Sequence, residues 1–257
     1  MSESKLKLGV NIDHVATLRN ARYVSMLDAA NTEPSVLAAA HEVEAAGADS
    51  ITVHLRADRR HIVDSDVFEL RENIRTKLNL EMGNTQEILN IALKVKPDFA
   101  CLVPENREEV TTEGGLDVKG ADESLQRTID SLRESGVRVS LFVDPVVEQI
   151  EAAAKTGAEM IELHTGAFAN AAVPGGQSEL AELIEAANVG HELGLQINAG
   201  HGITLSNLAT LMQVPHLAEL NVGHHLISRA LFVGLSRTVQ SMLAVMQNYP
   251  LPLAQKV

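Results

Sequence analysis

Short apolar runs of strand length recur along the whole chain. Their residues are rich in β-branched side chains and leucine, which is typical of strands buried in a parallel sheet. We predict eight strands, at Leu6–Ile12, Ser50–Val53, Leu78–Leu80, Phe99–Val103, Val137–Val143, Met160–Leu163, Leu195–Ile197 and Ala218–Val222.

Segments with apolar residues at helical spacing separate these runs. We predict helices at Pro34–Ala46, Val63–Arg75, Thr85–Val95, Glu123–Ser135, Val146–Thr156, Ser178–Leu193, Thr204–Met212 and Leu226–Gln247. Glycines follow four of these helices, at the position where a left-handed glycine commonly ends a helix. They are Gly47, Gly136, Gly157 and Gly194.

Eight strands that alternate with eight helices predict an α/β fold with a buried parallel sheet. Residues 1–257 contain no linker rich in proline or serine, and one closed barrel of this kind uses about 250 residues. We therefore predict a single-domain (β/α)8 TIM barrel with extra helices. The similar segments 47–54 and 157–164 fit a half-barrel repeat. They fit a common helix-to-strand junction equally well, and both interpretations stay open.

Composition excludes several classes of function. Lysine and arginine number 21 against 34 aspartates and glutamates, and this net charge of −13 excludes a global basic field for nucleic acid. Aromatic residues are too few for stacking on single-stranded nucleic acid. No apolar run approaches the length of about 20 residues that crosses a bilayer. The single Cys101 allows no intramolecular disulfide, so we expect a cytoplasmic protein without nucleic-acid or membrane partners.

Histidines and carboxylates gather where the predicted strands end. Six of the ten histidines lie within a few residues of such an end, where barrels of this kind carry their reactive groups. The groups there include Asn11, Asp13, His14, His54, Arg56, Glu81, Glu105, Asp144, Glu162, His164, His201 and His224. This concentration predicts an active site at the C-terminal mouth of the barrel. We interpret His41, His191, His216 and the thiol of Cys101 as structural.

Three chemistries compete for these residues. A metal site needs histidine and carboxylate ligands, but residues 11–14 (NIDH) lack the two histidines, two apart, that open many barrel hydrolases. An enzyme imine needs a lysine at the C-terminal end of a strand, and none stands there. Metal-free acid–base catalysis on a carbonyl substrate needs histidine and glutamate with matched pKa values. His54, Glu81 and His201 supply these groups, and burial should raise the pKa of Glu81.

Anion binding is indicated by glycine-bearing loops after the last two predicted strands, at 198–202 and 221–224. These loops form the usual phosphate site of the fold, because glycine admits backbone N–H groups at a helix N-terminus. Arginines follow the first two strands, at Arg19, Arg22, Arg56, Arg59 and Arg60. Two cationic regions on an acidic protein suggest two phosphorylated substrates. The alternative for Arg59 and Arg60 is that they are solvated residues at the start of a helix.

The segment Glu105–Gly120 is long and polar, and it contains two adjacent glycines, Gly114 and Gly115, and two adjacent threonines, Thr111 and Thr112. It fits a lid that closes over substrate and keeps water from reactive intermediates. It fits a plain surface loop equally well.

Nine motifs, spread from the first predicted strand to the last, resemble the pyridoxine 5′-phosphate synthase family. The longest, at 9–22, is GVNIDHVATLRNAR and is highly specific. The others are ITVHLR (51–56), DRRH (58–61), NLEM (79–82), CLVPE (101–105), VTTEGGLD (110–117), IELHTG (161–166), NAGHG (198–202) and LNVGH (220–224). The chain departs from the family at 23–33, where we expect a shorter stretch with a glycine and prolines.

The resemblance implies a TIM barrel that assembles as a homo-octamer. It implies condensation of 3-amino-2-oxopropyl phosphate with 1-deoxy-D-xylulose 5-phosphate, giving pyridoxine 5′-phosphate, phosphate and water without a metal or organic cofactor. The interpretation from the residues agrees, since an imine between the two substrates needs no enzyme lysine and two phosphates need two cationic regions.

The resemblance also implies roles for individual residues. The acid–base groups are His54, Glu81 and His201, with Glu162 as a supporting charge. The contacts to the aminoketone phosphate are Asn11, Arg22, Gly202, Gly223 and His224. The contacts to the deoxyxylulose phosphate are Asp13, His14, Arg56, His61 and Thr111.

Two other hypotheses stay open. A metal-dependent barrel hydrolase or isomerase would be favoured by tightly bound zinc or manganese in the purified protein. A non-catalytic barrel that binds phosphosugars would bind ligand without turnover, and the surplus of acid–base groups at the strand ends argues against it.

Overall fold

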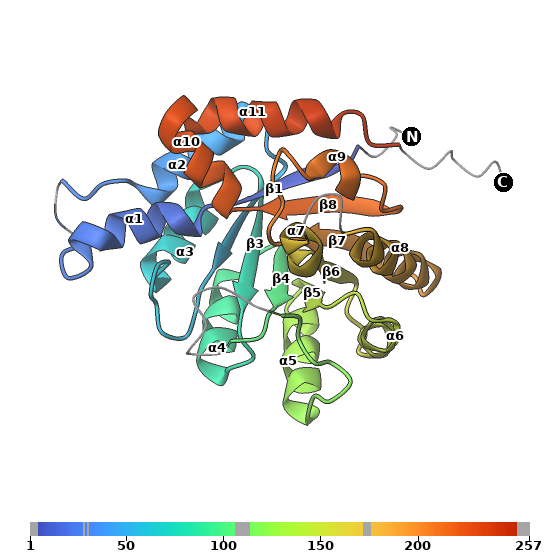
Figure 1. Ribbon diagram of the computed structural model, residues 1–257. Coiled ribbons are helices and arrows are strands. Elements are labelled where there is room, and N and C mark those ends of the chain that lie inside the picture. Colours follow the sequence, from blue (N-terminus) through green and yellow to red (C-terminus); the bar gives the residue numbers. More distant parts are fainter. Residues whose placement is uncertain (1–4, 28, 30, 106–113, 172–175, 251–257) are drawn as a thin grey trace.

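Eight parallel strands close into a barrel in the computed structural model, which describes residues 5–250 apart from 28, 30, 106–113 and 172–175. Each strand pairs with the next along the chain, and the last pairs with the first (Figure 1). The strands are β1 (Lys7–Asn11), β2 (Ser50–His54), β3 (Lys77–Met82), β4 (Phe99–Leu102), β5 (Arg138–Val143), β6 (Met160–His164), β7 (Gln196–Gly200) and β8 (Leu217–Val222). The predicted barrel and its eight strands are confirmed.

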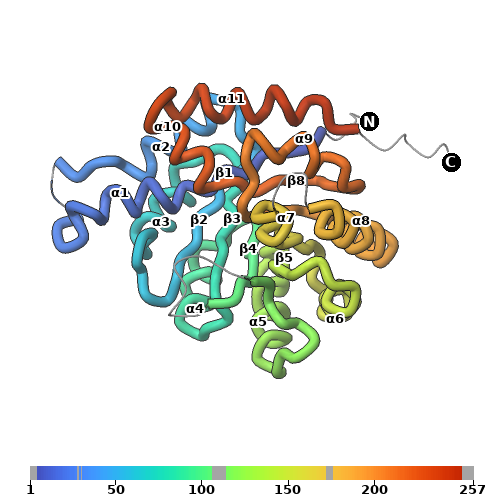
Figure 2. The backbone as a smooth tube through the Cα atoms, viewed as in Figure 1, coloured from blue at the N-terminus to red at the C-terminus, as the bar shows by residue number. Residues whose placement is uncertain are grey.

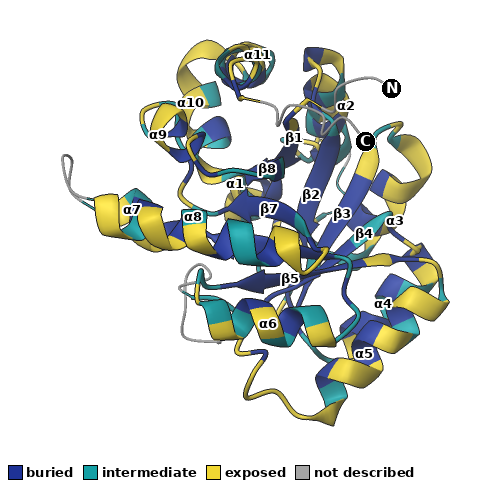
Figure 3. Cartoon of the chain, turned by 90° about the vertical axis from the view of Figure 1, so that its right-hand side faces the viewer, coloured by how far each residue is buried: buried dark blue, intermediate teal, exposed yellow. Residues whose placement is uncertain are grey.

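Helices cover the outside of the barrel, with their buried faces against the sheet and their exposed faces outward (Figure 3). They are α1 (Asp13–Tyr23), α2 (Val36–Ala46), α3 (Asp64–Asn73), α4 (Gln86–Val95), α5 (Glu123–Glu134), α6 (Val147–Lys155), α7 (Gly166–Asn170), α8 (Gln177–Glu192), α9 (Leu208–Leu211), α10 (His224–Val233) and α11 (Leu235–Met246). Near the end of the chain, α11 lies beside α2 (Figure 2). None of the helices in the described ranges is both long and apolar enough to span a bilayer.

Helix α1 was not predicted, because a charged residue interrupts its apolar stripe. Its buried face includes Val15, Ala16 and Tyr23, but the position between them is Arg19, which is also buried. Arg19 is neutralised by a bidentate pair with Asp66 of α3, at 2.5 and 2.9 Å. A stripe that includes a guanidinium has no clear apolar period, so the sequence pattern hides the helix.

The end of the chain also differs from its prediction. The single helix expected over Leu226–Gln247 is two helices, α10 and α11, that meet at Gly234 with φ 86°. The helix expected over Thr204–Met212 shortens to the single turn of α9, and the short α7 was not predicted. The four helix-ending glycines were predicted correctly, with φ between 82° and 103°.

The apolar core lies between the sheet and the helices, while the barrel interior is largely polar. Outward residues such as Ile51 and Leu80 are fully buried in the core. Inward residues make polar contacts across the barrel instead. Ser50 Oγ donates to Glu219 Oε1 at 2.6 Å, and Thr52 Oγ1 donates to Asn221 Oδ1 at 3.0 Å. A barrel lined by these groups can hold ionisable side chains at its mouth that an apolar interior would exclude.

The N-terminal end of the barrel carries ion pairs around a cavity of about 590 Å³. Asp98 is the centre of one group, with Lys77 Nζ at 2.6 Å and Arg71 Nη1 at 2.9 Å. Burial alone would raise the pKa of Asp98, but the hydrogen bonds from Lys77 and the Leu78 N–H hold it below its ordinary value. Asp98 is therefore paired with two cationic side chains at this end of the barrel.

Candidate active site

The ends of β2 and β3 bring His54 and Glu81 side by side at the mouth. The two residues are partners in the parallel register. His54 Nδ1 lies 4.0 Å from Glu81 Oε2, and the two side chains are 6% and 16% exposed. The structure therefore brings together two of the three predicted acid–base groups in a nearly dry position.

Asn11 and Asp13, at the junction of β1 and α1, hold this pair from the neighbouring strand. Asp13 Oδ1 accepts a hydrogen bond from the His54 backbone N–H at 2.8 Å, and Asp13 Oδ2 accepts one from Asn11 Nδ2 at 2.8 Å. The Asn11 side chain also hydrogen bonds to Glu81. Two residues predicted as substrate contacts thus also orient the acid–base pair.

Burial raises the pKa of Glu81 well above its ordinary value, as predicted. The carboxyl groups of Glu162 and Asp13 raise the pKa further, and the Asn11 hydrogen bond opposes them. A raised pKa favours the protonated form of the Glu81 carboxyl group, so this group can donate a proton as well as accept one. A carboxyl of this kind beside an imidazole matches the requirement for proton transfer in both directions.

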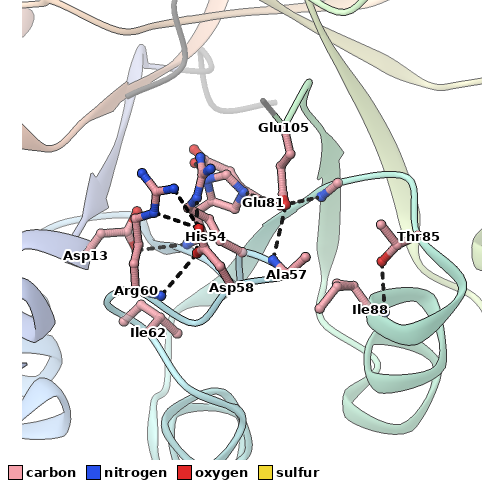
Figure 4. A network of polar contacts seen from close by, with 12 residues as sticks. Asp13, His54, Ala57, Asp58, Arg60, Ile62, Glu81, Thr85, Ile88 and Glu105 are labelled. Carbon is pink, nitrogen blue, oxygen red and sulfur yellow. Dashed lines mark hydrogen bonds and ion pairs between the residues drawn. The ribbon is translucent and has the colours of Figure 1, made fainter. Parts of the chain in front are cut away.

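Glu105, which follows β4, contacts the other side of the His54 ring (Figure 4). Its Oε1 lies 2.9 Å from His54 Nε2, and its Oε2 accepts a hydrogen bond from the Ala57 N–H at 3.1 Å. Glu105 was predicted to lie at a strand end, without a role. Nothing in the sequence shows which neighbouring ring its side chain reaches.

Glu162, in the middle of β6, is buried below the mouth. Its Oε2 accepts a hydrogen bond from Asn221 Nδ2 at 2.6 Å, and the Cys101 thiol lies 4.0 Å from the same oxygen. Burial raises the pKa of Glu162 to about 8, opposed by the Asn221 hydrogen bond and assisted by Glu219. A Cβ at Gly200 would overlap Glu162 Oε1, so the carboxyl group needs glycine at that position. Burial likewise raises the pKa of Cys101, consistent with an inert thiol.

His201, after β7, reaches the mouth from the opposite side. Its backbone is in the left-handed region with φ 79°, and the Thr165 hydroxyl donates to the carbonyls of Gly200 and His201 at 2.9 and 2.5 Å. Burial lowers the pKa of His201, and the neighbouring His164 lowers it further. Its ring is therefore neutral at neutral pH. Strained conformations of this kind concentrate at functional sites.

His164 and Asp144 form a second carboxylate–histidine pair beside His201. His164 Nδ1 lies 2.8 Å from Asp144 Oδ1, and the His164 and His201 ring centroids are 5.1 Å apart. The hydrogen bond with His164 holds the pKa of Asp144 below its ordinary value. Both residues were predicted to lie at strand ends, without a role. The likeness of 157–164 to 47–54 could have indicated one for His164, because it puts His164 at the position equivalent to His54.

The two predicted glycine loops follow β7 and β8. The first precedes the short α9, and the second leads directly into the longer α10. Gly202 has φ 78°, and a Cβ there would lie 2.5 Å from the Ala169 Cβ. Gly223 is the N-cap residue of α10. It lies so close to Asn11 that a Cβ at position 223 would be 3.0 Å from the Asn11 Cβ. The start of α10 therefore lies directly beside the Asn11 side chain.

His14 and His61 connect the predicted contacts of the two phosphates. The His14 ring lies 5.1 Å from the exposed His224 ring at the start of α10, and the His61 ring lies 6.1 Å from His54. Burial lowers the pKa of both His14 and His61, and Asp13 opposes it in each case. The predicted contacts of the two substrates are therefore neighbours along one side of the mouth.

The arginines after β2 differ in burial. Arg56 is buried at the mouth, with its Nε 3.5 Å from Asp58 Oδ1. Arg59 pairs with Asp64, the first residue of α3, at 2.7 Å and with Glu87 at 2.6 Å. Arg60 pairs with Asp58 at 2.6 Å. Of these three, Arg56 has the least exposed side chain.

Of the remaining predicted contacts, Arg22 lies away from the start of α1. Arg22 is exposed in the last turn of α1, with its guanidinium carbon 5.5 Å from the Tyr23 ring centroid. A rise of 1.5 Å per residue puts it about 12 Å along the helix axis from His14. Thr111 lies outside the described residues, as do residues 106–113 of the predicted lid.

The arrangement is suited to repeated proton transfer on a small anionic substrate. Glu81 and Glu162 have raised pKa values and His201 has a lowered one, so burial favours protonated carboxyl groups beside a neutral imidazole. Within the described residues, no group of three or more His, Cys, Asp and Glu side chains is arranged to hold a metal ion. Proton transfer is the chemistry that the geometry offers.

Comparison with known proteins connects this site to one family. A family model described as pyridoxal phosphate biosynthesis protein PdxJ matches residues 8–248. A pyridoxine 5′-phosphate synthase from Akkermansia muciniphila is 56% identical over 236 residues, which cover 91% of this chain and 96% of that protein. A pyridoxine 5′-phosphate synthase from Synechocystis is 52% identical over 246 residues, which cover 95% of this chain and 99% of that protein.

Solved structures share the architecture at much lower identity. Tryptophan synthase from M. tuberculosis aligns with a TM-score of 0.64 at 12% identity, over 96% of this chain and 94% of that chain. Phosphoribosyl anthranilate isomerase from Thermus thermophilus aligns with a TM-score of 0.59 at 13% identity, over 94% of this chain and 98% of that chain. These likenesses are of fold alone.

Proposed function

The chain belongs to the PdxJ family of pyridoxine 5′-phosphate synthases, which are biosynthetic enzymes. On that premise we propose that it condenses 3-amino-2-oxopropyl phosphate with 1-deoxy-D-xylulose 5-phosphate, without a metal or organic cofactor. The products are pyridoxine 5′-phosphate, inorganic phosphate and water. The observation that carries the proposal is the pair of Glu81 and His54, a carboxyl group with a raised pKa 4.0 Å from an imidazole nitrogen.

The acid–base steps are assigned to His54, Glu81 and His201. Joining an amine to a ketone, enolising the product and expelling water each require a proton to leave one atom and arrive at another. Glu81 and His54 serve one side of the bound substrates, and the neutral His201 ring serves the other. Glu162 supports them, because its carboxyl raises the pKa of Glu81 and so keeps the proton there.

The phosphates are assigned to two neighbouring places. The aminoketone phosphate lies against Gly202, Gly223 and His224, where loop glycines and the start of α10 present backbone N–H groups. The deoxyxylulose phosphate lies against the buried Arg56, with His14 and His61 beside it. Asn11 and Asp13 complete the two sets from β1 and α1. The roles of Arg22 and Thr111 stay predictions from the family resemblance.

An imine between the two substrates requires no lysine from the protein. The lysines nearest the sheet stand at the N-terminal ends of strands, with Lys7 first in β1 and Lys77 first in β3. They are therefore at the far end of the barrel from the mouth. The amine comes instead from 3-amino-2-oxopropyl phosphate, and the protein supplies orientation and proton transfer.

The decisive experiment mixes both substrates with protein stripped of metal by a chelator. We expect the pyridoxine phosphate chromophore to form, with one inorganic phosphate released for each product molecule. Turnover that appears only after zinc or manganese is returned would favour a metal-dependent barrel enzyme. Tight binding of either substrate without turnover would favour a non-catalytic phosphosugar-binding barrel. Either result would overturn the proposal.

Assembly into a homo-octamer is the second part of the proposal. Exposed apolar side chains support self-association, notably Phe232 of α10, which is 85% exposed, together with Leu231, Leu18, Val24 and Met26. Light scattering on the eluting protein should give eight times the chain mass of 27.7 kDa. A monomeric mass at micromolar concentration would contradict the octamer without affecting the assignment of the reaction.

A further inference from the structure

The carboxylate of Glu105 joins three loops at the mouth of the barrel. Its Oε1 accepts a hydrogen bond from the Gly83 N–H at 3.0 Å, after β3, and lies 2.9 Å from His54 Nε2, at the end of β2. Its Oε2 accepts from the Ala57 N–H at 3.1 Å. The side chain is 12% exposed. Both oxygens are therefore used inside the protein rather than offered to substrate or water.

Glu105 is an acceptor in all three contacts. Burial alone would raise the pKa of Glu105, but the hydrogen bonds from His54 and Ala57 hold it below its ordinary value. An ionised carboxylate has no proton to donate, so the hydrogen in its contact with His54 belongs to Nε2. In the neutral ring, the other nitrogen, Nδ1, then has its lone pair facing Glu81 Oε2 at 4.0 Å.

Gly83, which lies beside Glu105 in the fold, gives a second indication that the fold accommodates this contact. A Cβ at Gly83 would lie 2.7 Å from the Glu105 carboxyl carbon. Gly83 is not among the residues with positive φ, so its backbone does not require glycine. The absence of a side chain at position 83 is explained by the close approach of Glu105.

We propose that Glu105 is a positioning residue, which holds His54 in the Nε2–H tautomer and turns the Nδ1 lone pair toward Glu81. His54 then stands between an acceptor that never takes its proton and a carboxyl that can exchange one. Fixing the tautomer in this way is how a carboxylate commonly prepares a histidine to act as a base. The catalytic part of this inference rests on the proposed function, whereas the tautomer itself does not.

The tautomer is measured directly by NMR of protein labelled with ¹⁵N-histidine, at a pH where the ring is neutral. The His54 signals are assigned by their loss in His54→Gln. We expect the Nε2–H form in the parent protein. In Glu105→Gln, whose amide group both donates and accepts, we expect the Nδ1–H form to appear, with kcat reduced 10- to 100-fold and KM for each substrate changed less than threefold.

Gly83→Ala tests the same contact without removing a charge. The new methyl group displaces the Glu105 carboxylate, so the same tautomer change and the same loss of kcat are expected. The matched control is Glu44→Gln at the other end of the barrel. Glu44 is also a buried carboxylate that accepts backbone N–H bonds, from Arg75 at 2.6 Å and Thr76 at 2.7 Å. It should alter stability but neither the His54 tautomer nor kcat.

The outcomes separate this inference from the proposed function. An Nδ1–H tautomer in an active parent enzyme overturns the role of Glu105 and leaves the reaction intact. An unchanged tautomer and kcat in Glu105→Gln does the same. If the parent makes no product yet its tautomer depends on Glu105, the positioning role stands and the proposed function fails. If Glu105→Gln does not fold, Gly83→Ala decides.

Discussion

Each side of the barrel mouth contains a carboxylate paired with a histidine, and the two pairs serve different purposes. His54 and His164 are the last residues of β2 and β6, in the two similar segments 47–54 and 157–164. His54 meets Glu105 through Nε2 at 2.9 Å, and His164 meets Asp144 through Nδ1 at 2.8 Å. The Glu105 side chain is 12% exposed, whereas that of Asp144 is 45% exposed.

The third group on each side makes the difference. Beyond His54 stands Glu81, whose pKa is raised, and beyond His164 stands the His201 ring, whose pKa is lowered. Burial therefore favours the protonated form of a carboxyl group on one side and the neutral form of an imidazole on the other. Equivalent positions in a barrel acquire opposite roles through one neighbour, rather than through the histidine itself.

The strongest way to break this comparison is Glu81→Gln. Glutamine keeps the size and the hydrogen bonding of Glu81 but cannot transfer a proton, so kcat should fall by at least about 10²-fold, the usual scale for a general acid–base group. Substrate affinity and Tm should change little. Glu219→Gln is the matched control, because burial also raises the pKa of Glu219 but it lies deeper, bonded to Ser50. Near-normal kcat in Glu81→Gln would refute its assignment.

Asp144→Asn tests the other side. Asp144 acts on His201 only through His164, and solvent screens its half-exposed charge, so we expect a loss in kcat of about tenfold. The effect should be smaller than that of Glu105→Gln measured in parallel. A larger loss for Asp144→Asn would reverse the order of the two sides and make the His201 side the dominant one.

Glu162→Gln sharpens the comparison through the pH dependence of stability. The pKa of Glu162 is raised from 4.5 to about 8, so the folded protein binds a proton there that the unfolded chain releases. The contribution of Glu162 to the free energy of unfolding of the parent should therefore fall as pH rises from about 4.5 to 8 and then level off. Urea denaturation across this range should give a flatter profile for Glu162→Gln. An identical slope would mean that Glu162 is ionised in the folded state.

The smallest effect is expected from Arg59→Ala, outside both sides of the mouth. Its ion pairs with Asp64 and Glu87 are on the surface, and pairs of this kind contribute about 0–1 kcal/mol. Both kcat and KM should stay within twofold of the parent values. A large rise in KM for the deoxyxylulose phosphate would instead place Arg59 in the site beside Arg56.

The sequence predicts the frame of this site better than its internal connections. The strands were predictable because their outward residues are apolar at every second position, and the strand ends then located His54, Glu81 and His201. Helix α1 was missed because the guanidinium of Arg19 occupies its buried stripe. The contacts of Glu105 were not predictable, because its side chain crosses from the loop after β4 to the end of β2. Hydrophobic periodicity predicts which face of a strand or helix is buried, but it does not predict which residue a polar side chain contacts.

The missing side chain of Gly9 has a consequence for anyone who redesigns this barrel. A Cβ at position 9 would overlap side-chain oxygens of Asn221, Ser50 and Glu219, which converge from β8 and β2. A combinatorial library that varies position 9 alone should therefore return only glycine. One that varies positions 9, 50, 219 and 221 together should return correlated sets, in which each gain of volume at position 9 accompanies a loss at a facing position. Substitutions within this polar layer are coupled, so the layer has to be redesigned as one unit.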